Sequence, residues 1–267
     1  MVTFKHSLAR VAVWNLAGFG GVPADRMRQQ ALGLALLDAE LVTLVEVNPL
    51  SLIHDLAAEL QHYGLTYQAA ILQQPNSSLN IGFLHKDGVD VSNVQFVPGS
   101  QGDYANGRMA VRADVEIGRL RAVLIGVHLK SGRDGPDQSL RDSQCKAIGT
   151  YLTDLRNTSP FKTRTLLLMG DFNMIPGQDV SNFHHLGGED LMDFVSCWDL
   201  QDRFSHILDA GRANLLDGFA VSRTFSRDYV RGSLRLFPMH WTLDMGREKF
   251  KDTVSDHLPF VASFRVF

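Results

Sequence analysis

Several apolar segments of this sequence end in, or carry, side chains that can take part in chemistry. The clearest is "LLLMGDFNMIPG" (166–177), in which an apolar run meets Asp171 and Asn173 just before a Pro-Gly turn. Aspartate and asparagine are ordinary turn residues, but the end of a strand is also a rigid mount for a functional group. Other segments of the same kind carry Asn15, Glu46, His128, Asp217, and the adjacent Asp256 and His257.

The residue types in this set favour metal-assisted chemistry on a phosphate ester. Carboxylates on inward-facing strands are costly unless they are paired, bound to a metal or exposed in a cleft. Oxygen ligands from Glu, Asp and Asn suit Mg²⁺, Mn²⁺ or Ca²⁺ better than zinc. Two histidines beside acids can transfer protons near neutral pH. A lone His or Glu is usually structural, but six such segments in one chain predict an active site that hydrolyses phosphate esters.

The elements that would position these side chains alternate along the chain. Strand patterns cover 10–16, 41–47, 66–72, 79–86, 109–117, 119–131, 164–173, 215–222 and 258–267. Helical patterns cover 23–39, 51–64 and 142–157. Adjacent strand patterns predict antiparallel hairpins, and helices between strands predict covered outer faces. We therefore expect an α/β fold in which two mainly antiparallel sheets pack face to face, with helices on the outside.

Length and composition fit a single domain over residues 1–267, with no repeat, low-complexity tract or linker. The net charge of −3 leaves no global basic excess, so a polyanion must be bound by local patches or by metal ions. Cys145 and Cys197 fit neither a zinc spacing nor a disulfide framework. No apolar run reaches the ~20 residues of a transmembrane segment, and no motif indicates a protein partner. No signal peptide is visible, which leaves open a cytoplasmic protein and a secreted one whose signal has been removed.

The motifs, taken in order, resemble those of a known superfamily. They resemble the motifs of the endonuclease/exonuclease/phosphatase superfamily, also called DNase I-like. The matching segments are "WN" (14–15), "LVTLVEV" (41–47), "VHLKS" (127–131), "MGDFN" (169–173), "LLDGFAVS" (215–222) and "SDHLP" (255–259). The superfamily includes nucleases, abasic-site endonucleases, sphingomyelinases and inositol-polyphosphate 5-phosphatases. The resemblance covers nearly the whole chain, and "GDFN" and "SDH" are its most specific parts. It implies a four-layer α/β sandwich, in agreement with the alternation of elements.

The resemblance also implies a role for each matching residue around the metal. Glu46 would be the principal Mg²⁺ ligand, with Asn15 beside it. Asp256 would help to hold the metal, directly or through water. Asp171 and Asn173 would position the attacking water and the scissile phosphate.

The acid-base groups follow from the same resemblance. His257 would contact the phosphate or accept the proton of the water, with Asp217 orienting its imidazole. His128 would bind a phosphate oxygen or protonate the leaving group. Asp171 and the His257–Asp217 pair both qualify as the general base. Gly218 follows Asp217 where many members have an aromatic residue or histidine, so this match departs from the family pattern.

Basic residues near the strand ends bear on the substrate. The segment "HLKSGRDGPDQSLRDSQ" (128–144) contains Lys130 and Arg141, and it resembles bacterial DNase-like members more than lipid phosphatases. Arg108, in "YANGRMAV", could also reach a phosphate. We therefore expect a nucleic-acid substrate, and DNA in particular, with these three cations on its phosphates.

A second basic segment, "VSRTFSRDYVRGSLRLFP" (221–238), spaces four arginines four residues apart, with Phe225 and Tyr229 between them. If it is helical, it would present a row of guanidinium groups to a phosphate backbone. The alternative is a solvated surface segment. Two other functions stay open: a phosphatase or phosphodiesterase acting on a lipid or small phosphoester, such as a phosphoinositide or sphingomyelin, and a binding module without catalysis. The intact set of acids and histidines argues against the binding module.

Overall fold

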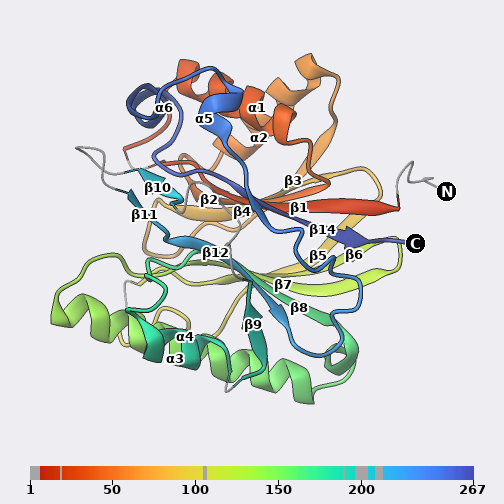
Figure 1. Ribbon diagram of the computed structural model, residues 1–267, viewed down its shortest axis with the longest axis vertical. Coiled ribbons are helices and arrows are strands. Elements are labelled where there is room, and N and C mark those ends of the chain that lie inside the picture. Colours follow the sequence, from red (N-terminus) through yellow and green to blue (C-terminus); the bar gives the residue numbers. More distant parts are fainter. Residues whose placement is uncertain (1–6, 19, 105–106, 189, 196–203, 208–212) are drawn as a thin grey trace.

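The computed structural model describes residues 7–18, 20–104, 107–188, 190–195, 204–207 and 213–267. They form two six-stranded sheets packed face to face (Figure 1). The first sheet has the order β13 (Arg235–Leu236), β14 (Phe260–Arg265), β1 (Leu8–Asn15), β2 (Leu41–Val47), β4 (Asn80–Lys86), β3 (Tyr67–Ile71). The second has the order β5 (Val89–Phe96), β6 (Val111–Ile117), β7 (Leu120–His128), β8 (Thr165–Asp171), β12 (Asp217–Ser222), β9 (Met192–Phe194). A small separate sheet consists of β10 (His206–Ile207) and β11 (Ala213–Asn214).

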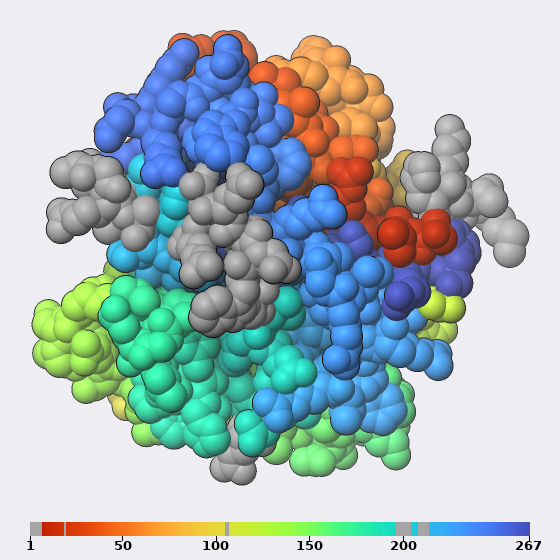
Figure 2. All heavy atoms as spheres, viewed as in Figure 1, coloured from red at the N-terminus to blue at the C-terminus, as the bar shows by residue number. Residues whose placement is uncertain are grey.

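Helices cover both outer faces, which makes four layers. The helices α1 (Ala24–Leu37), α2 (Leu52–Leu60), α5 (Met239–Thr242) and α6 (Arg247–Thr253) lie over the first sheet, and α3 (Gly135–Asn157) and α4 (Val180–Leu186) lie over the second (Figure 1). In the space-filling view, orange and blue segments lie above the green middle part of the chain, and further blue segments lie beside it (Figure 2). The predicted four-layer α/β sandwich is therefore confirmed. Within the described residues, no helix combines the length and the apolar character needed to cross a membrane.

Most neighbouring strands are antiparallel, as predicted, but each sheet also contains one parallel pair. The strands β1 and β2 run parallel in the first sheet, and β7 and β8 run parallel in the second. The carboxyl ends of the two strands in a parallel pair lie at the same edge of their sheet. Each parallel pair therefore brings two strand ends, and the side chains on them, close together.

The sequence of β8 is a continuous apolar run because both faces of this strand are buried. Leu167 and Met169 face the core between the two sheets, whereas Leu166 and Leu168 belong to a second cluster that includes residues of α3. A strand that is buried on both faces has no polar side to show in its sequence. The sheets also approach closely, because a Cβ added at Gly126 would lie 2.8 Å from Cγ2 of Ile81.

The sequence expectation did not include the short elements β9, β10, β11, β13, α4, α5 and α6, and two longer elements differ from it for local reasons. The helix α3 begins at Gly135 and not at 142, because the side chain of Asp134 accepts the N–H of Asp137 and so caps an earlier start. The edge strand β5 was not predicted. Its partly exposed residues and a register shift between Ser92 and Gln95 interrupt the apolar alternation.

The arginine-rich segment does not form the helical row considered above. It follows β12, which runs antiparallel to β8 with Asp217 opposite Asp171. The chain therefore leaves β12 at the far end of the sheet, where the carbonyl of Phe225 accepts a hydrogen bond from Oγ1 of Thr165, the first residue of β8. Arg223 forms ion pairs with surface aspartates there. The start of this segment lies away from the strand ends that carry the candidate catalytic groups.

Candidate active site

The ends of four strands and the start of a fifth meet at one edge of the sandwich. Asn15 ends β1 and Glu46 lies one residue before the end of β2. His128 ends β7, Asp171 ends β8, and Asp217 begins β12 opposite Asp171. The amide of Asn15 joins the two sheets, because its Nδ2 lies 3.3 Å from Oε1 of Glu46 and 3.2 Å from Oδ2 of Asp171. Residues that are far apart in the sequence therefore form one polar site.

His257 lies between two carboxylates. Its Nδ1 is 2.6 Å from Oδ2 of Asp217, and its Nε2 is 3.9 Å from Oδ2 of Asp171. Its backbone is held on both sides, by the indole N–H of Trp14 on its carbonyl (2.9 Å) and by Oγ of Ser255 on its N–H (3.0 Å). Burial alone would lower the pKa of His257, but the charge of Asp217, supported by other carboxylates, raises this pKa to about 10. The imidazole therefore carries a positive charge at neutral pH.

Asp171 is a buried carboxyl group that titrates near neutrality. Its Oδ1 accepts the backbone N–H of Asn173 (2.9 Å), and its Oδ2 lies 3.8 Å from Nε2 of His128. Burial, and then the charge of Asp217, raises the pKa of Asp171 to about 7. Asn173 has a left-handed backbone (φ 50°), and its side-chain amide donates to the carbonyl of Leu129 (3.1 Å). A carboxyl group with this pKa suits proton transfer at neutral pH.

His128 is a neutral imidazole at neutral pH. Burial, together with the positive charges of Arg108 and His257, lowers its pKa well below 6.5. Its Nε2 lies 3.5 Å from Oε1 of Glu46, so the proton of the neutral ring belongs on this nitrogen. Its Nδ1 is buried and has no hydrogen-bond partner among the described residues. His128 is therefore placed to donate a hydrogen bond from Nε2.

An open polar pocket adjoins these groups. It has a volume of about 400 Å³ and is lined by Ala17, Arg26, Glu46, Lys251, Asp252 and Asp256. Glu46 reaches it from a left-handed backbone position (φ 59°) at a register shift in β2. Gly18 is required beside it, because an added Cβ would lie 1.8 Å from the carbonyl oxygen of Glu46. The pocket is thus lined by three acidic residues, Glu46 from β2, Asp252 from α6 and Asp256, together with two basic ones.

The donor set at this pocket fits a hard divalent cation. The carboxylates of Glu46 and Asp256 face the same open space, and Glu46, His128 and Asp171 offer ligand atoms within 4.8 Å of one another. Carboxylate oxygens with room for water are the ligands that Mg²⁺, Mn²⁺ and Ca²⁺ prefer. The side-chain oxygen of Asn15 accepts the N–H of the next residue but one (3.0 Å), and its amide nitrogen faces the carboxylates. Asn15 therefore holds Glu46 and Asp171 in place.

Two of the three expected phosphate-binding cations lie close to the site. Arg108 is half-buried and donates to the carbonyls of His128 (3.2 Å) and Leu129 (2.9 Å), so it supports the end of β7. Lys130 follows two residues after His128, and its Nζ lies 2.6 Å from Oδ1 of Asp137 at the surface. Arg108 thus has a structural role in this arrangement, whereas the side chain of Lys130 lies at the surface near the end of β7.

Arg141 departs from the expectation of a surface cation. Its side chain is fully buried, and its guanidinium donates to the carbonyls of Lys130 (2.7 Å) and Gly132 (3.0 Å). It also lies 3.4 Å from Oδ1 of Asp179. A buried cation needs such partners to replace water. Arg141 therefore holds the loop after β7 and does not face a ligand.

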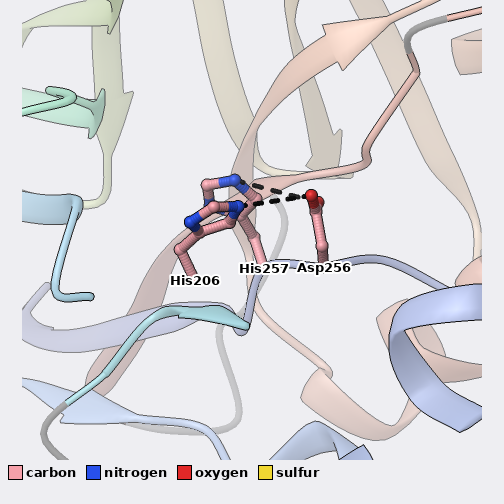
Figure 3. A group of neighbouring side chains, drawn as sticks. All are labelled: His206, Asp256 and His257. Carbon is pink, nitrogen blue, oxygen red and sulfur yellow. Dashed lines mark ion pairs between the residues drawn. The ribbon is translucent and has the colours of Figure 1, made fainter. Parts of the chain in front are cut away.

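The structure adds residues to the site that the sequence did not indicate. Arg26 and Lys251 line the pocket from α1 and α6. His206, in the short strand β10, lies 3.4 Å from Oδ2 of Asp256 and packs its ring against that of His257, with 4.6 Å between centroids (Figure 3). A single histidine in a segment without clear periodicity offers no local signal. Only the pairing of β10 with the chain at His257 reveals its place.

The layers of this chain have known counterparts. Two mainly antiparallel sheets between helices are also the fold of solved proteins of the endonuclease/exonuclease/phosphatase family. Sequence comparison alone does not reach it, since no family model and no curated protein matches the chain.

Several solved structures are similar to this chain over nearly its whole length. TDP2 from D. rerio, complexed with a single-strand DNA product, aligns with a TM-score of 0.71 at 17% identity, over 97% of this chain and 99% of that one. A variant of the 3′ phosphatase NExo from Neisseria, bound to a product DNA hairpin, has a TM-score of 0.68 at 18% identity, over 96% and 99%. An endonuclease/exonuclease/phosphatase family protein from Bacteroides thetaiotaomicron has a TM-score of 0.69 at 12% identity, over 98% of both chains. At these identities the comparison establishes the fold.

Proposed function

We propose that this protein is a divalent-metal-dependent phosphodiesterase that hydrolyses DNA. The observation that carries the proposal is the joint placement of three features. The Asp217–His257 pair, with 2.6 Å between Oδ2 and Nδ1, directs an imidazolium toward Asp171. Asp171 itself titrates near neutrality, and the carboxylates of Glu46 and Asp256 face an adjoining pocket. A positive charge, a base and a metal-binding set are together what hydrolysis of a phosphodiester requires.

Glu46 and Asp256 are the proposed ligands of a divalent metal, Mg²⁺ in the first place, and Asn15 positions Glu46. Such an ion, when bound, would stabilise negative charge on the phosphate and favour ionisation of an attacking water. Arg26 and Lys251 line the same pocket, but its three acids outnumber them, so a bound divalent ion would be needed to make the pocket attractive to an anionic ester.

We assign the general base to Asp171 and the phosphate contact to His257. His257 is already protonated at neutral pH, so it cannot accept the proton of the water, but it can stabilise a non-bridging phosphate oxygen. Asp171, with a pKa of about 7, can accept that proton as the water oxygen attacks phosphorus and the ester P–O bond breaks. The N–H of His128 and the amide of Asn173 are then available to hold the phosphate.

The choice of DNA is supported by the structural neighbours and by cations that lie around the strand ends. The D. rerio TDP2 structure contains single-strand DNA product, and the NExo structure contains a DNA hairpin. Both are similar to this chain over almost its whole length. The cations Arg26, Lys130 and Arg108 lie around the strand ends, where they can contact phosphates on either side of the scissile one.

The test is a matched hydrolysis assay on the wild-type protein, His257→Ala and the control His185→Ala. His185 pairs with Asp142 on the α3–α4 side of the molecule and belongs to no part of the site. Supercoiled plasmid, single-stranded DNA, RNA, an abasic duplex and a small phosphodiester are each offered with Mg²⁺ and with EDTA. We expect metal-dependent cutting of DNA by the wild type and by His185→Ala, and none by His257→Ala.

Other outcomes of this assay separate the alternatives. Turnover of the small phosphodiester alone would keep the catalytic assignment and refute the DNA substrate. Cutting that His257→Ala retains would refute the assignment of the site. No hydrolysis of any substrate at high protein concentration would refute the enzyme and favour a binding module on this fold.

A further inference from the structure

A second group of possible metal ligands lies beside the proposed Mg²⁺ pocket and has a different chemical character. His206, Asp256 and His257 each offer one ligand atom, and these atoms lie within 4.8 Å of one another. Nε2 of His206 is 3.4 Å from Oδ2 of Asp256, and Nε2 of His257 is 3.8 Å from Oδ1 of the same carboxylate. Both rings point these nitrogens toward Asp256 (Figure 3).

These separations suit tetrahedral coordination. Ligand atoms that lie about 2.0–2.1 Å from a Zn²⁺ ion in a tetrahedral site are about 3.3 Å apart. The contacts of 3.4 Å to Oδ2 and 3.8 Å to Oδ1 of Asp256 are near that value, and one ligand atom from each of the three residues lies within 4.8 Å of the others, so small side-chain shifts would suffice. Two imidazoles and one carboxylate are a common catalytic zinc set, whereas Mg²⁺ favours oxygen ligands and octahedral geometry. The ligand types therefore select a zinc-class ion over Mg²⁺.

The surrounding contacts already orient the ligands. Asp217 holds Nδ1 of His257 at 2.6 Å, which turns the other ring nitrogen toward Asp256. A carboxylate behind a ligating histidine is the usual support of such a ligand. His206 is held by its backbone, since residue 206 forms a β-bridge with His257 and the next residue, Ile207, donates its N–H to the carbonyl of Asp256 (2.7 Å). Little rearrangement is needed to close the three groups on an ion, whose binding would release the proton of Nε2 of His257 to solvent.

We propose that His206, His257 and Asp256 form a binding site for Zn²⁺ or a chemically similar divalent ion, and that its occupation inhibits the enzyme. The inhibitory part rests on the proposed function. An ion on Nε2 of His257 takes the atom that contacts the phosphate, and it also draws Asp256 away from the Mg²⁺ pocket. His206 is the residue that distinguishes this site, because it has no place in the hydrolysis proposed above.

Metal binding is tested directly and without activity. The metal-stripped full-length chain is titrated with Zn²⁺ by calorimetry and with Co²⁺ by visible absorption, in excess Mg²⁺. We expect one Zn²⁺ per chain and the intense absorption of tetrahedral Co²⁺ in the wild type and in the control His185→Ala. His206→Ala should weaken Zn²⁺ binding by at least about tenfold, the lower end of what changes around a metal site cost. His206→Cys, which supplies a thiolate, should restore binding and add a thiolate-to-Co²⁺ absorption band. Equal Zn²⁺ affinity in the wild type and His206→Ala would overturn the site, as would weak binding in both.

Inhibition is tested in a second arm with the DNA substrate and Mg²⁺. We expect Zn²⁺ to inhibit the wild type and His185→Ala at similar concentrations, and His206→Ala to require at least about ten times more. Equal sensitivity of His206→Ala and the wild type would refute inhibition through this site. If no variant hydrolyses DNA, the proposed function fails together with the inhibition that rests on it, and the calorimetry still decides whether the metal site exists.

Discussion

The Asp217–His257 pair offers the sharpest test of the electrostatics of this site. Asp217→Asn removes the negative charge and keeps the shape of the side chain. In the wild type, burial lowers the pKa of His257, but Asp217 and the other carboxylates raise it from 6.5 to about 10. Without the charge of Asp217, burial is opposed only by the more distant Asp171 and Asp256. We therefore expect the pKa of His257 to fall to 6.5 or below in this variant.

The size of the effect follows from the two pKa values. The gap between 6.5 in the unfolded chain and about 10 in the folded protein corresponds to about 5 kcal/mol of folding free energy. Because the folded pKa is the higher one, this stabilisation is fully present below pH 6.5 and is lost as the pH rises toward 10. Breaking a buried ion pair typically costs about 3–5 kcal/mol, which is of the same size. Asp217→Asn should thus be less stable than the wild type by about 3–5 kcal/mol at pH 6, and the difference should nearly vanish at pH 10.

The assay is urea unfolding at pH 6, 8 and 10 in EDTA, with the imidazole of His257 followed by NMR. Asp114→Asn is the matched control, because Asp114 has a similarly buried side chain and pairs with Arg112 at 2.7 Å. An arginine stays charged over this range, so the destabilisation of Asp114→Asn should be the same at each pH. A stability difference for Asp217→Asn that does not change between pH 6 and pH 10, or a His257 pKa that stays near 10, would refute the reasoning. In the hydrolysis assay with Mg²⁺, Asp217→Asn should lower kcat by about 10²–10⁴-fold, the usual contribution of one acid-base group.

Three further predictions concern other parts of the site. Glu46→Gln should weaken Mn²⁺ binding in a calorimetric titration by at least about tenfold and abolish metal-dependent hydrolysis, and unchanged Mn²⁺ affinity would contradict its role as a ligand. Arg141→Met should lower the free energy of unfolding by about 3–5 kcal/mol, because it removes a buried cation with several partners. Arg133→Met, which removes an exposed cation from the same Asp179, should cost less than about 1 kcal/mol, and equal losses would show that Arg141 is not structural. Asn173→Ala should lose about 1–2 kcal/mol of stability because residue 173 has a positive φ, whereas Asn173→Gly should lose less. Both variants lack the side-chain amide, so both should lose hydrolytic activity. Retained activity in either variant would exclude a contact between this amide and the phosphate.

The sequence by itself determined most of the longer elements and the chemical groups they carry. Strand β2 spans the predicted residues 41–47, and β8 ends at Asp171 as the apolar run "TLLLMGD" indicates. These features are local: an apolar run, a turn residue or a capping group acts over a few neighbouring positions. The order of the motifs was also enough to predict the four-layer sandwich, because strands buried between helices and a second sheet have a recognisable pattern.

Only the tertiary structure decided which of these groups meet and in what electrostatic state. Arg141 was expected to contact a substrate phosphate, yet it is buried under the loop after β7. The arginine-rich segment left a phosphate-binding helix and a solvated surface segment open, and strand pairing places its start at the far end of β8. The sequence around His206 does not indicate a functional role, yet a β-bridge to His257 places its side chain next to Asp256. Strand register and burial are set by contacts between distant segments, and burial and neighbouring charge in turn set the pKa of each group. For that reason the sequence indicates the residues that could act, while the packing of the two sheets determines their arrangement and their charge.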